Sequence, residues 1–143
     1  MSSQPAGSPA EIAMHYDGAR GCALRYLAAM EARDLDTASR LVSADLELVF
    51  PGSVRRSELG EIVSGSAARY RRIGKRVEGC DLCELPDGTS VVYVRGTLHG
   101  QWPDGSDFAG IRFIDRFELR DGLIRRQEVW NDAGEWRLRE RRI

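Results

Sequence analysis

The chain has 143 residues, of which 30% are charged, and its formal net charge is −1. This length predicts one domain whose core is large enough to fold without disulfide staples. The balanced charge argues against a bulk electrostatic attraction to nucleic acid, and the lack of an apolar run of about 20 residues argues against a membrane-spanning helix.

The N-terminal residues, MSSQPAGSPA, lack the basic and apolar regions of a secretion signal. We therefore expect a flexible tail over residues 1–8, one domain over residues 9–143 and a cytoplasmic protein. The three cysteines, Cys22, Cys80 and Cys83, are an odd number, which argues against a disulfide framework. No second pair completes a zinc site with Cys80 and Cys83, so we expect no metal and no other cofactor. Lys75 is the only lysine, which we interpret as a compositional bias.

Helical spacing dominates the first half of the chain. Apolar side chains recur every three or four residues over residues 9–33, which predicts a helix with one buried stripe that includes Tyr26. Asp34 is placed to cap a short helix over residues 35–42. Alternation over residues 46–50, ahead of Pro51, predicts a short strand. Ser57 then opens a helix to about residue 70.

After residue 74 the hydrophobic period changes to two. The alternation predicts strands over residues 75–85, 89–102, 108–120 and 123–132. Asp-Gly turns join these runs, and such turns are strong hairpin signals. The second half therefore predicts an antiparallel meander. Helices first and strands after indicate an α+β fold, with the helices packed on one face of the sheet.

Asp115 is the one polar residue on the apolar face of the strand over residues 108–120. It alternates with Phe113 and Phe117, so we expect it to be buried against the helices. An isolated ionised carboxylate in an apolar site is costly. Two interpretations follow: a structural pair with Arg95 or Arg112, or a catalytic acid or hydrogen-bond donor in a pocket.

Two segments, RYLAAMEARDLDTASRLVSADLELVFPG at residues 25–52 and FIDRFELRDGLI at residues 113–124, resemble the steroid delta-isomerase (ketosteroid isomerase-like) family of the nuclear transport factor 2-like superfamily. The resemblance covers roughly residues 22–132. It implies a cone: a strongly curved antiparallel sheet wrapped around about three N-terminal helices, with an apolar pocket at the open end.

The resemblance also implies roles for particular residues. Tyr26 matches the pocket tyrosine that donates a hydrogen bond to the substrate oxyanion. Asp115 matches the aspartic acid that an apolar site keeps protonated as a second donor. The general base of the family stands just before the proline that ends the first strand, and this chain has Phe50 there. The usual base is therefore missing.

Other residues are candidates for the missing base. Continuing the alignment puts Tyr93, Arg95, Thr97 and His99 on one strand face, which we expect to line the pocket. His99 is the first candidate, because histidine titrates near neutral pH. If Arg95 lies beside Asp115, its charge favours the ionised carboxylate. Asp115 is then itself the base, as in the similar SnoaL-type polyketide cyclases.

The last strand carries QEVWND at residues 127–132. Register with the family points Gln127, Val129 and Asn131 inward and Trp130 outward. Asn131 is then a neutral orienting group, as in the similar scytalone-dehydratase-like enzymes. A shift by one residue would reverse these faces and make Asp132 the alternative base.

Two functional hypotheses follow. The first is a cofactor-free enzyme that acts on a small, mostly apolar carbonyl compound as an isomerase, cyclase or dehydratase. Its expected catalytic residues are Tyr26, Asp115 and His99, and its expected substrate-binding residues are Phe50, Tyr93, Arg95, Thr97, Phe113 and Asn131. The second is a non-catalytic module of the same fold that binds a small ligand or only dimerises. In both cases we expect a homodimer through the outer sheet face.

Overall fold

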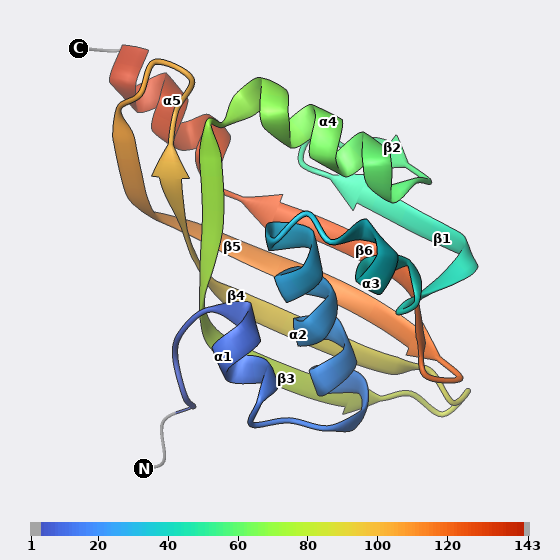
Figure 1. Ribbon diagram of the computed structural model, residues 1–143. Helices are drawn as coiled ribbons and strands as arrows, with labels where there is room; N and C mark the ends of the chain where they lie inside the picture. The colour runs from blue at the N-terminus through green and yellow to red at the C-terminus, as the bar shows by residue number, and fades with distance from the viewer. Residues whose placement is uncertain (1–3, 142–143) are drawn as a thin grey trace.

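A strongly curved, six-stranded sheet forms the frame of the protein in a computed structural model that describes residues 4–141 (Figure 1). The strand order is β2-β1-β6-β5-β4-β3. The strands are β1 (Val42–Phe50), β2 (Val54–Arg56), β3 (Arg72–Glu84), β4 (Ser90–Gln101), β5 (Asp107–Arg120) and β6 (Leu123–Asn131). Strands β3 to β6 form the predicted antiparallel meander, and β1 joins β6 in parallel.

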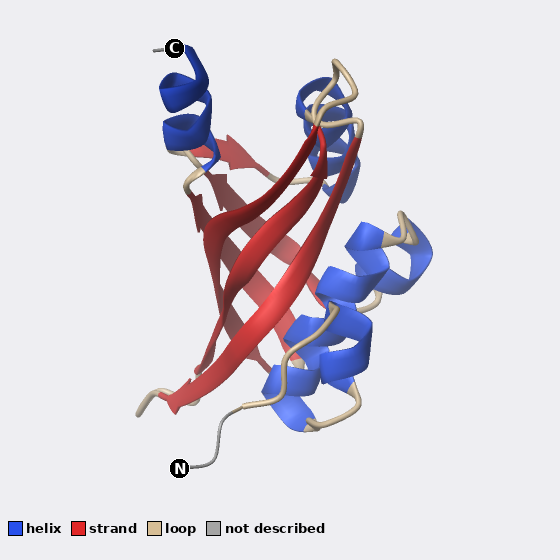
Figure 2. Cartoon of the chain, turned by 90° about the vertical axis from the view of Figure 1, so that its left-hand side faces the viewer, coloured by secondary structure: helices blue, strands red, loops and turns tan. Residues whose placement is uncertain are grey.

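Three helices precede the sheet in sequence and cover one of its faces. They are α1 (Pro9–Ala13), α2 (Gly18–Glu31) and α3 (Leu35–Ser39), and they are followed by α4 (Leu59–Arg69) and α5 (Ala133–Arg141). Figure 2 shows α1 to α3 packed on one side of the curved sheet, with α5 set apart at its end. The α+β class and the cone-like arrangement are thus confirmed. Among the described residues, no helix is long and apolar enough to cross a membrane.

The helix expected over residues 9–33 is two helices. The chain leaves α1 at Met14 and enters α2 at Gly18, whose φ of +61° lies in the left-handed region that glycine tolerates. The apolar spacing continues across this break, so periodicity alone did not reveal it. The short strand β2 and the C-terminal α5 were not predicted either, since β2 is exposed along its whole length.

Side chains cap two of the helices, and the cap at Asp34 is the one that the sequence predicts. The Asp34 carboxylate accepts a hydrogen bond from the backbone N–H of Thr37 at 3.1 Å and so caps α3. The Glu61 carboxylate accepts from the backbone N–H groups of Ser57 and Glu58. Helix α4 therefore begins at Leu59, two residues later than predicted.

Bulges bend the sheet where it wraps around the pocket. The register of β3 against β4 shifts between Val77 and Gly79, and that of β4 against β5 shifts between Leu98 and Gly100. Gly96 lies at the first bend, and a Cβ atom there would overlap the carbonyl oxygen of Arg76. Glycine therefore permits the close approach of β3 and β4 that the bend requires.

The N-terminal segment lies along the free edge of β3. Gly7 and Val77 exchange two backbone hydrogen bonds, of 3.0 Å and 2.7 Å. The backbone N–H of Cys80 donates to Gln4 Oε1 at 2.6 Å. The expected flexible tail is therefore bonded to the sheet between Gln4 and Gly7, and residues 1–3 lie outside the described residues. This contact covers part of an edge that would otherwise offer unpaired backbone groups.

Candidate functional site

A pocket opens between α2, α4 and the inner face of the sheet. Its cavity volume is about 200 Å³, which exceeds the roughly 150 Å³ of an apolar cavity that takes benzene. Phe50 and Phe113 lie in its wall, as expected. Trp102 does not line the pocket. Its side chain stacks on Tyr70, with ring centres 5.6 Å apart, and leaves the cavity open. The pocket therefore has room for a ring-sized ligand.

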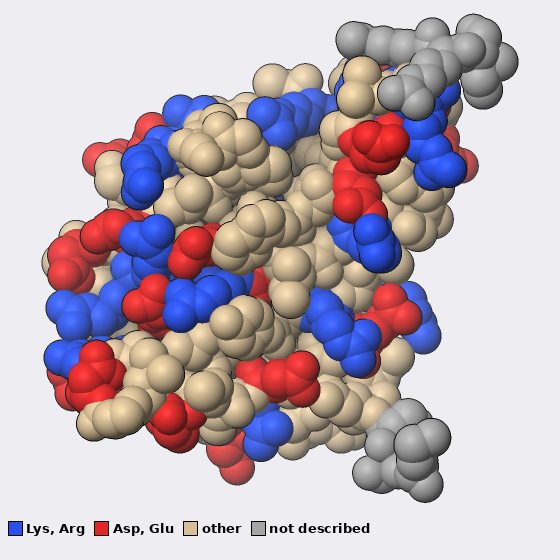
Figure 3. All heavy atoms as spheres, turned by 180° about the vertical axis from the view of Figure 1, so that it is seen from behind, with Lys and Arg blue, Asp and Glu red and all other residues tan. Residues whose placement is uncertain are grey.

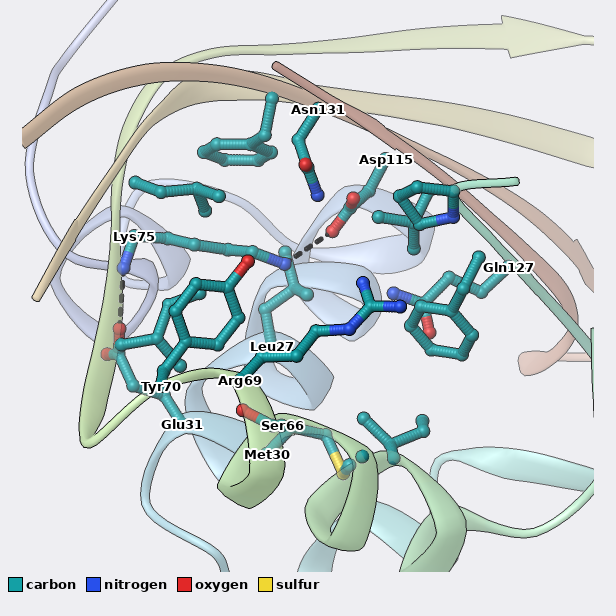
Figure 4. Close-up of a pocket in the computed structure, with 18 of the residues that line it drawn as sticks. Leu27, Met30, Glu31, Ser66, Arg69, Tyr70, Lys75, Asp115, Gln127 and Asn131 are labelled. Atoms are coloured by element: carbon teal, nitrogen blue, oxygen red, sulfur yellow. Dashed lines mark hydrogen bonds and ion pairs between the residues drawn. The ribbon is translucent and has the colours of Figure 1, made fainter. Parts of the chain in front are cut away.

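Asp115 lies on β5 at the inner side of this pocket and is 0% exposed. Its Oδ2 forms an ion pair with Lys75 Nζ at 2.7 Å (Figure 4). The Lys75 ammonium also lies 5.0 Å from the centre of the Phe113 ring. The predicted burial of Asp115 is confirmed, but the predicted partners, Arg95 and Arg112, are wrong. Both arginines lie on the opposite face of the sheet.

The second oxygen of the carboxylate is free. Asp115 Oδ1 is buried and has no hydrogen-bond partner among the described residues. Buried polar atoms are nearly always bonded, so an exception calls for an explanation. An ionised carboxylate can only accept hydrogen bonds. With Oδ2 held by Lys75, Oδ1 is an unpaired acceptor on a residue that lines a mostly apolar pocket.

Helix α2 fixes the position of the lysine. Glu31, its last residue, accepts a hydrogen bond from the backbone N–H of Lys75 at 2.7 Å (Figure 4). Lys75 is opposite Leu98 in the register of β3 and β4, and Leu98 is buried on the inner face. The lysine side chain therefore points inward, toward Asp115.

Tyr26 on α2 is 1% exposed, and its hydroxyl donates to Gln127 Oε1 at 2.8 Å. Burial raises the pKa of Tyr26, and the negative charge of Asp115 raises it further. The residue is thus a neutral phenol whose proton is committed to Gln127. Because this bond takes Gln127 Oε1, the Gln127 amide nitrogen remains as a donor on the pocket wall.

The inward register of β6 is confirmed. Gln127, Val129 and Asn131 line the pocket, and Trp130 is 49% exposed on the outer face. The Asn131 Oδ1 accepts from the backbone N–H of Ala133 at 3.1 Å. This bond turns the Asn131 amide nitrogen toward the pocket, near Asp115 (Figure 4).

Asp132, the alternative base, lies outside the site. It forms an exposed ion pair with Arg112 at 2.7 Å. The family register of the last strand therefore holds, and the one-residue shift that would bring Asp132 inward does not occur.

The prediction for β4 is wrong by one residue. Tyr93, Arg95, Thr97 and His99 lie on the outer face, and none of them lines the pocket. The inner positions of β4 are the buried Val92, Val94, Gly96 and Leu98. Valine occurs on both faces of this strand at residues 91–94, so its pattern does not distinguish them. His99 is exposed and does not line the pocket. The Tyr93 hydroxyl accepts a hydrogen bond from Arg116 Nε at 3.2 Å.

Sequence reasoning missed Lys75, Arg69 and Tyr70 as pocket residues. For Lys75 a signal was present. It alternates with Ile73 and Val77, so it interrupts an apolar face as Asp115 does. Lys75 is also the only lysine in the chain, which strengthens this signal, although on sequence alone we interpret it as a compositional bias. Arg69 and Tyr70 gave no such signal, because they end a helix among other arginines.

Comparisons with known proteins agree with this fold. Residues 23–127 match the family described as SnoaL-like domain. TerC, co-crystallised with polyporic acid, is similar in structure at 19% identity and a TM-score of 0.67, over 82% of this chain and 93% of that one. ActVI-ORFA from Streptomyces coelicolor has 16% identity and a TM-score of 0.61, over 78% and 92% of the two chains. A polyketide cyclase-like protein from Pseudomonas putida has 19% identity and a TM-score of 0.63, over 85% and 96%. Among curated proteins, none matches this chain.

Proposed function

Because the chain belongs to the SnoaL-like domain family of the nuclear transport factor 2-like superfamily, we propose that its pocket catalyses a cofactor-free reaction of a small, mostly apolar carbonyl compound. The reaction is of the isomerase, cyclase or dehydratase type, and it begins with removal of a proton next to the carbonyl. One observation carries the proposal: the buried carboxylate of Asp115, a residue that lines the pocket, has one oxygen paired with Lys75 and the other without a hydrogen-bond partner among the described residues.

In the proposed first step, Asp115 Oδ1 takes the proton. The C–H bond breaks, an O–H bond forms on Asp115, and the electron pair passes to the substrate oxygen as an enolate. The pocket-lining amide nitrogens of Gln127 and Asn131 are neutral donors for that oxyanion. The enolate then takes that proton back from Asp115 at another carbon. Alternatively, it attacks a second carbonyl carbon to close a ring, and the alkoxide that forms takes the proton back from Asp115.

Lys75 gives Asp115 a role that differs from the one the resemblance to steroid isomerases implies. In that family the apolar site keeps the aspartic acid protonated as a donor. Here Asp115 Oδ2 instead accepts a hydrogen bond from the Lys75 ammonium at 2.7 Å. After proton transfer, the same ammonium lies close to the new negative charge of the enolate. Tyr26 acts as a positioning residue, because its hydroxyl holds the Gln127 side chain in place.

TerC, which is similar in structure to this chain, was co-crystallised with polyporic acid, and this supports a small organic ligand for the pocket described here. Phe50, Phe113 and Leu27 supply the apolar wall against which rings would pack.

We propose further that two copies of the chain associate through the outer face of the sheet. Trp130 is 49% exposed there, next to the partly buried Ile114. Figure 3 shows uncharged side chains between the clusters of acidic and basic residues on the rear surface. An apolar surface ringed by charge is typical of an interface between identical chains.

The test of catalysis is exchange of the hydrogens next to the carbonyl of 2-tetralone for deuterium, followed by NMR. We expect the wild type to accelerate exchange and Asp115→Asn to lose about 10²–10⁴-fold, the usual contribution of a positioned base. Asp132→Asn is the matched control, since it removes an aspartate from the outer face and should leave exchange unchanged. Equal exchange in Asp115→Asn and wild type would contradict the proposal. Binding of 2-tetralone without any exchange would favour the non-catalytic ligand-binding module.

A further inference from the structure

The charges in the pocket do not all have partners. Four basic and three acidic residues line it: Arg33, Arg56, Arg69 and Lys75, with Glu31, Glu61 and Asp115. Lys75 pairs with Asp115, and Arg56 lies 3.9 Å from Glu61. Arg33 donates to Ser66 Oγ and to the Met30 carbonyl oxygen. Within the part of the chain that the structure describes, Arg69 alone among these seven has no hydrogen bond or ion pair through its side chain.

Arg69 is the last residue of α4 and points into the pocket. Figure 4 shows its side chain extending across the cavity, with the guanidinium on the side of Gln127. A basic residue in the last turn of a helix is favoured by the helix dipole. That preference accounts for a cation at this position. It does not account for the direction of the side chain, which makes no hydrogen bond to the final carbonyl groups of α4.

We infer that the ligand of this pocket carries a carboxylate group that the Arg69 guanidinium binds. This inference rests on the proposed function and deepens it, because it makes the substrate an apolar oxo-carboxylic acid. The planar fork of arginine matches a carboxylate through two parallel hydrogen bonds, which gives both affinity and orientation.

The opposite wall of the pocket fixes which way round such a ligand lies. Asp115 faces the cavity from the sheet, and a ligand carboxylate placed beside its free Oδ1 would be repelled. Arg69 faces the cavity from α4, across from the sheet (Figure 4). The carboxylate end is therefore held on the α4 side, and the carbonyl end is directed to Asp115 and Lys75. The two charged walls together orient the reacting carbon toward the base.

The experiment compares 2-naphthoate with 2-naphthamide, which has the same shape and no charge, by isothermal titration calorimetry. Because Arg69 is exposed, we expect the wild type to bind 2-naphthoate about three- to fivefold more tightly, as an exposed charge pair predicts. Arg69→Gln should remove this preference and leave 2-naphthamide affinity within about twofold, and Arg69→Lys should retain part of it. Arg71→Gln is the matched control. It removes a neighbouring arginine that does not line the pocket, so it should bind both probes as the wild type does.

Three results would overturn the inference: equal wild-type affinity for the two probes, binding of neither, or a preference for 2-naphthoate that survives in Arg69→Gln. Circular dichroism of each variant verifies the fold first. The calorimetry requires no turnover, so its outcome is separate from the exchange assay. A protein that prefers 2-naphthoate through Arg69 but exchanges no hydrogen would refute the proposed catalysis and leave the carboxylate site standing.

Discussion

Replacing Lys75 by methionine isolates the energetic role of the ion pair in the pocket. The variant keeps an unbranched side chain of similar length and removes only the ammonium group. Asp115 is 0% exposed, so its charge would then be buried with neither oxygen paired. Losing one partner of a buried pair costs about 3–5 kcal/mol. The Lys75 side chain is 22% exposed, which places the expected loss at the lower end, about 3 kcal/mol.

Replacing the other partner of the pair, Asp115, should lower the unfolding free energy by less than Lys75→Met does. In Asp115→Asn the lysine can turn toward the pocket opening, and the amide can still accept a hydrogen bond, so we expect a loss of about 1–2 kcal/mol. The variant that combines Lys75→Met and Asp115→Asn should lose less unfolding free energy than the sum of the two separate losses, by at least about 1 kcal/mol. Arg112→Met is the matched control. It breaks an ion pair with the same 2.7 Å separation, but its partners are 83% and 37% exposed, so the loss should stay below about 1 kcal/mol.

Urea unfolding followed by tryptophan fluorescence measures these differences, and in a thermal scan the Lys75→Met loss corresponds to a fall in Tm of about 10 °C. The argument that burial of Asp115 determines the strength of the pair would be refuted by either of two results. In one, Lys75→Met is as stable as the wild type. In the other, it is no more destabilised than Arg112→Met.

Three further outcomes can be checked. Burial raises the pKa of Tyr26 in the folded protein above its value of about 10 in the unfolded chain. The stability that this raised pKa contributes is therefore complete below about pH 10 and is lost as the pH rises further. Between about pH 9 and about pH 11, Tyr26→Phe should lose less unfolding free energy than the wild type. Trp130→Glu should convert the proposed dimer to a monomer in sedimentation velocity, and a wild type that is monomeric at high micromolar concentration would contradict the proposed interface. The wild type should not isomerise a Δ5-3-ketosteroid at a useful rate, because Phe50 stands where that family has its base; rapid growth of conjugated-enone absorbance would show otherwise.

The fold was largely predictable because its strongest signals are local. The alternation of apolar and polar residues, together with the Asp-Gly turns, locates four strands within a few residues. The apolar neighbours of Asp115 on its strand face correctly predict its burial. The parallel pairing of β1 with β6 was not predictable in this way. It joins strands far apart in the sequence, and no local pattern encodes such a pairing.

The site was predictable where a strand has one apolar and one polar face, as around Asp115, or where the resemblance supplied the register. On β6 the family register alone placed Gln127 and Asn131 on the pocket side. On β4 both faces carry valine, and the predicted register put His99 and Arg95 inside when they are outside. The partner of Asp115 was missed for a different reason. The expected counter-ions were arginines near Asp115 on the predicted sheet, whereas the one lysine lies on the apolar face of a different strand, β3.

Phe50 and the Lys75–Asp115 pair can be understood as one change. A pocket of about 200 Å³ that held carboxylates at both position 50 and position 115 would bring two like charges together, and one of them would have to stay protonated. Steroid isomerases meet this condition by keeping the second acid neutral. In this chain the first position is an apolar phenylalanine, and a lysine lies against the second carboxylate. These two positions therefore bring no two carboxylates together. Under the proposed function, the acid–base role lies at Asp115 on the inner face of β5, and Phe50 contributes an apolar wall for substrate rings.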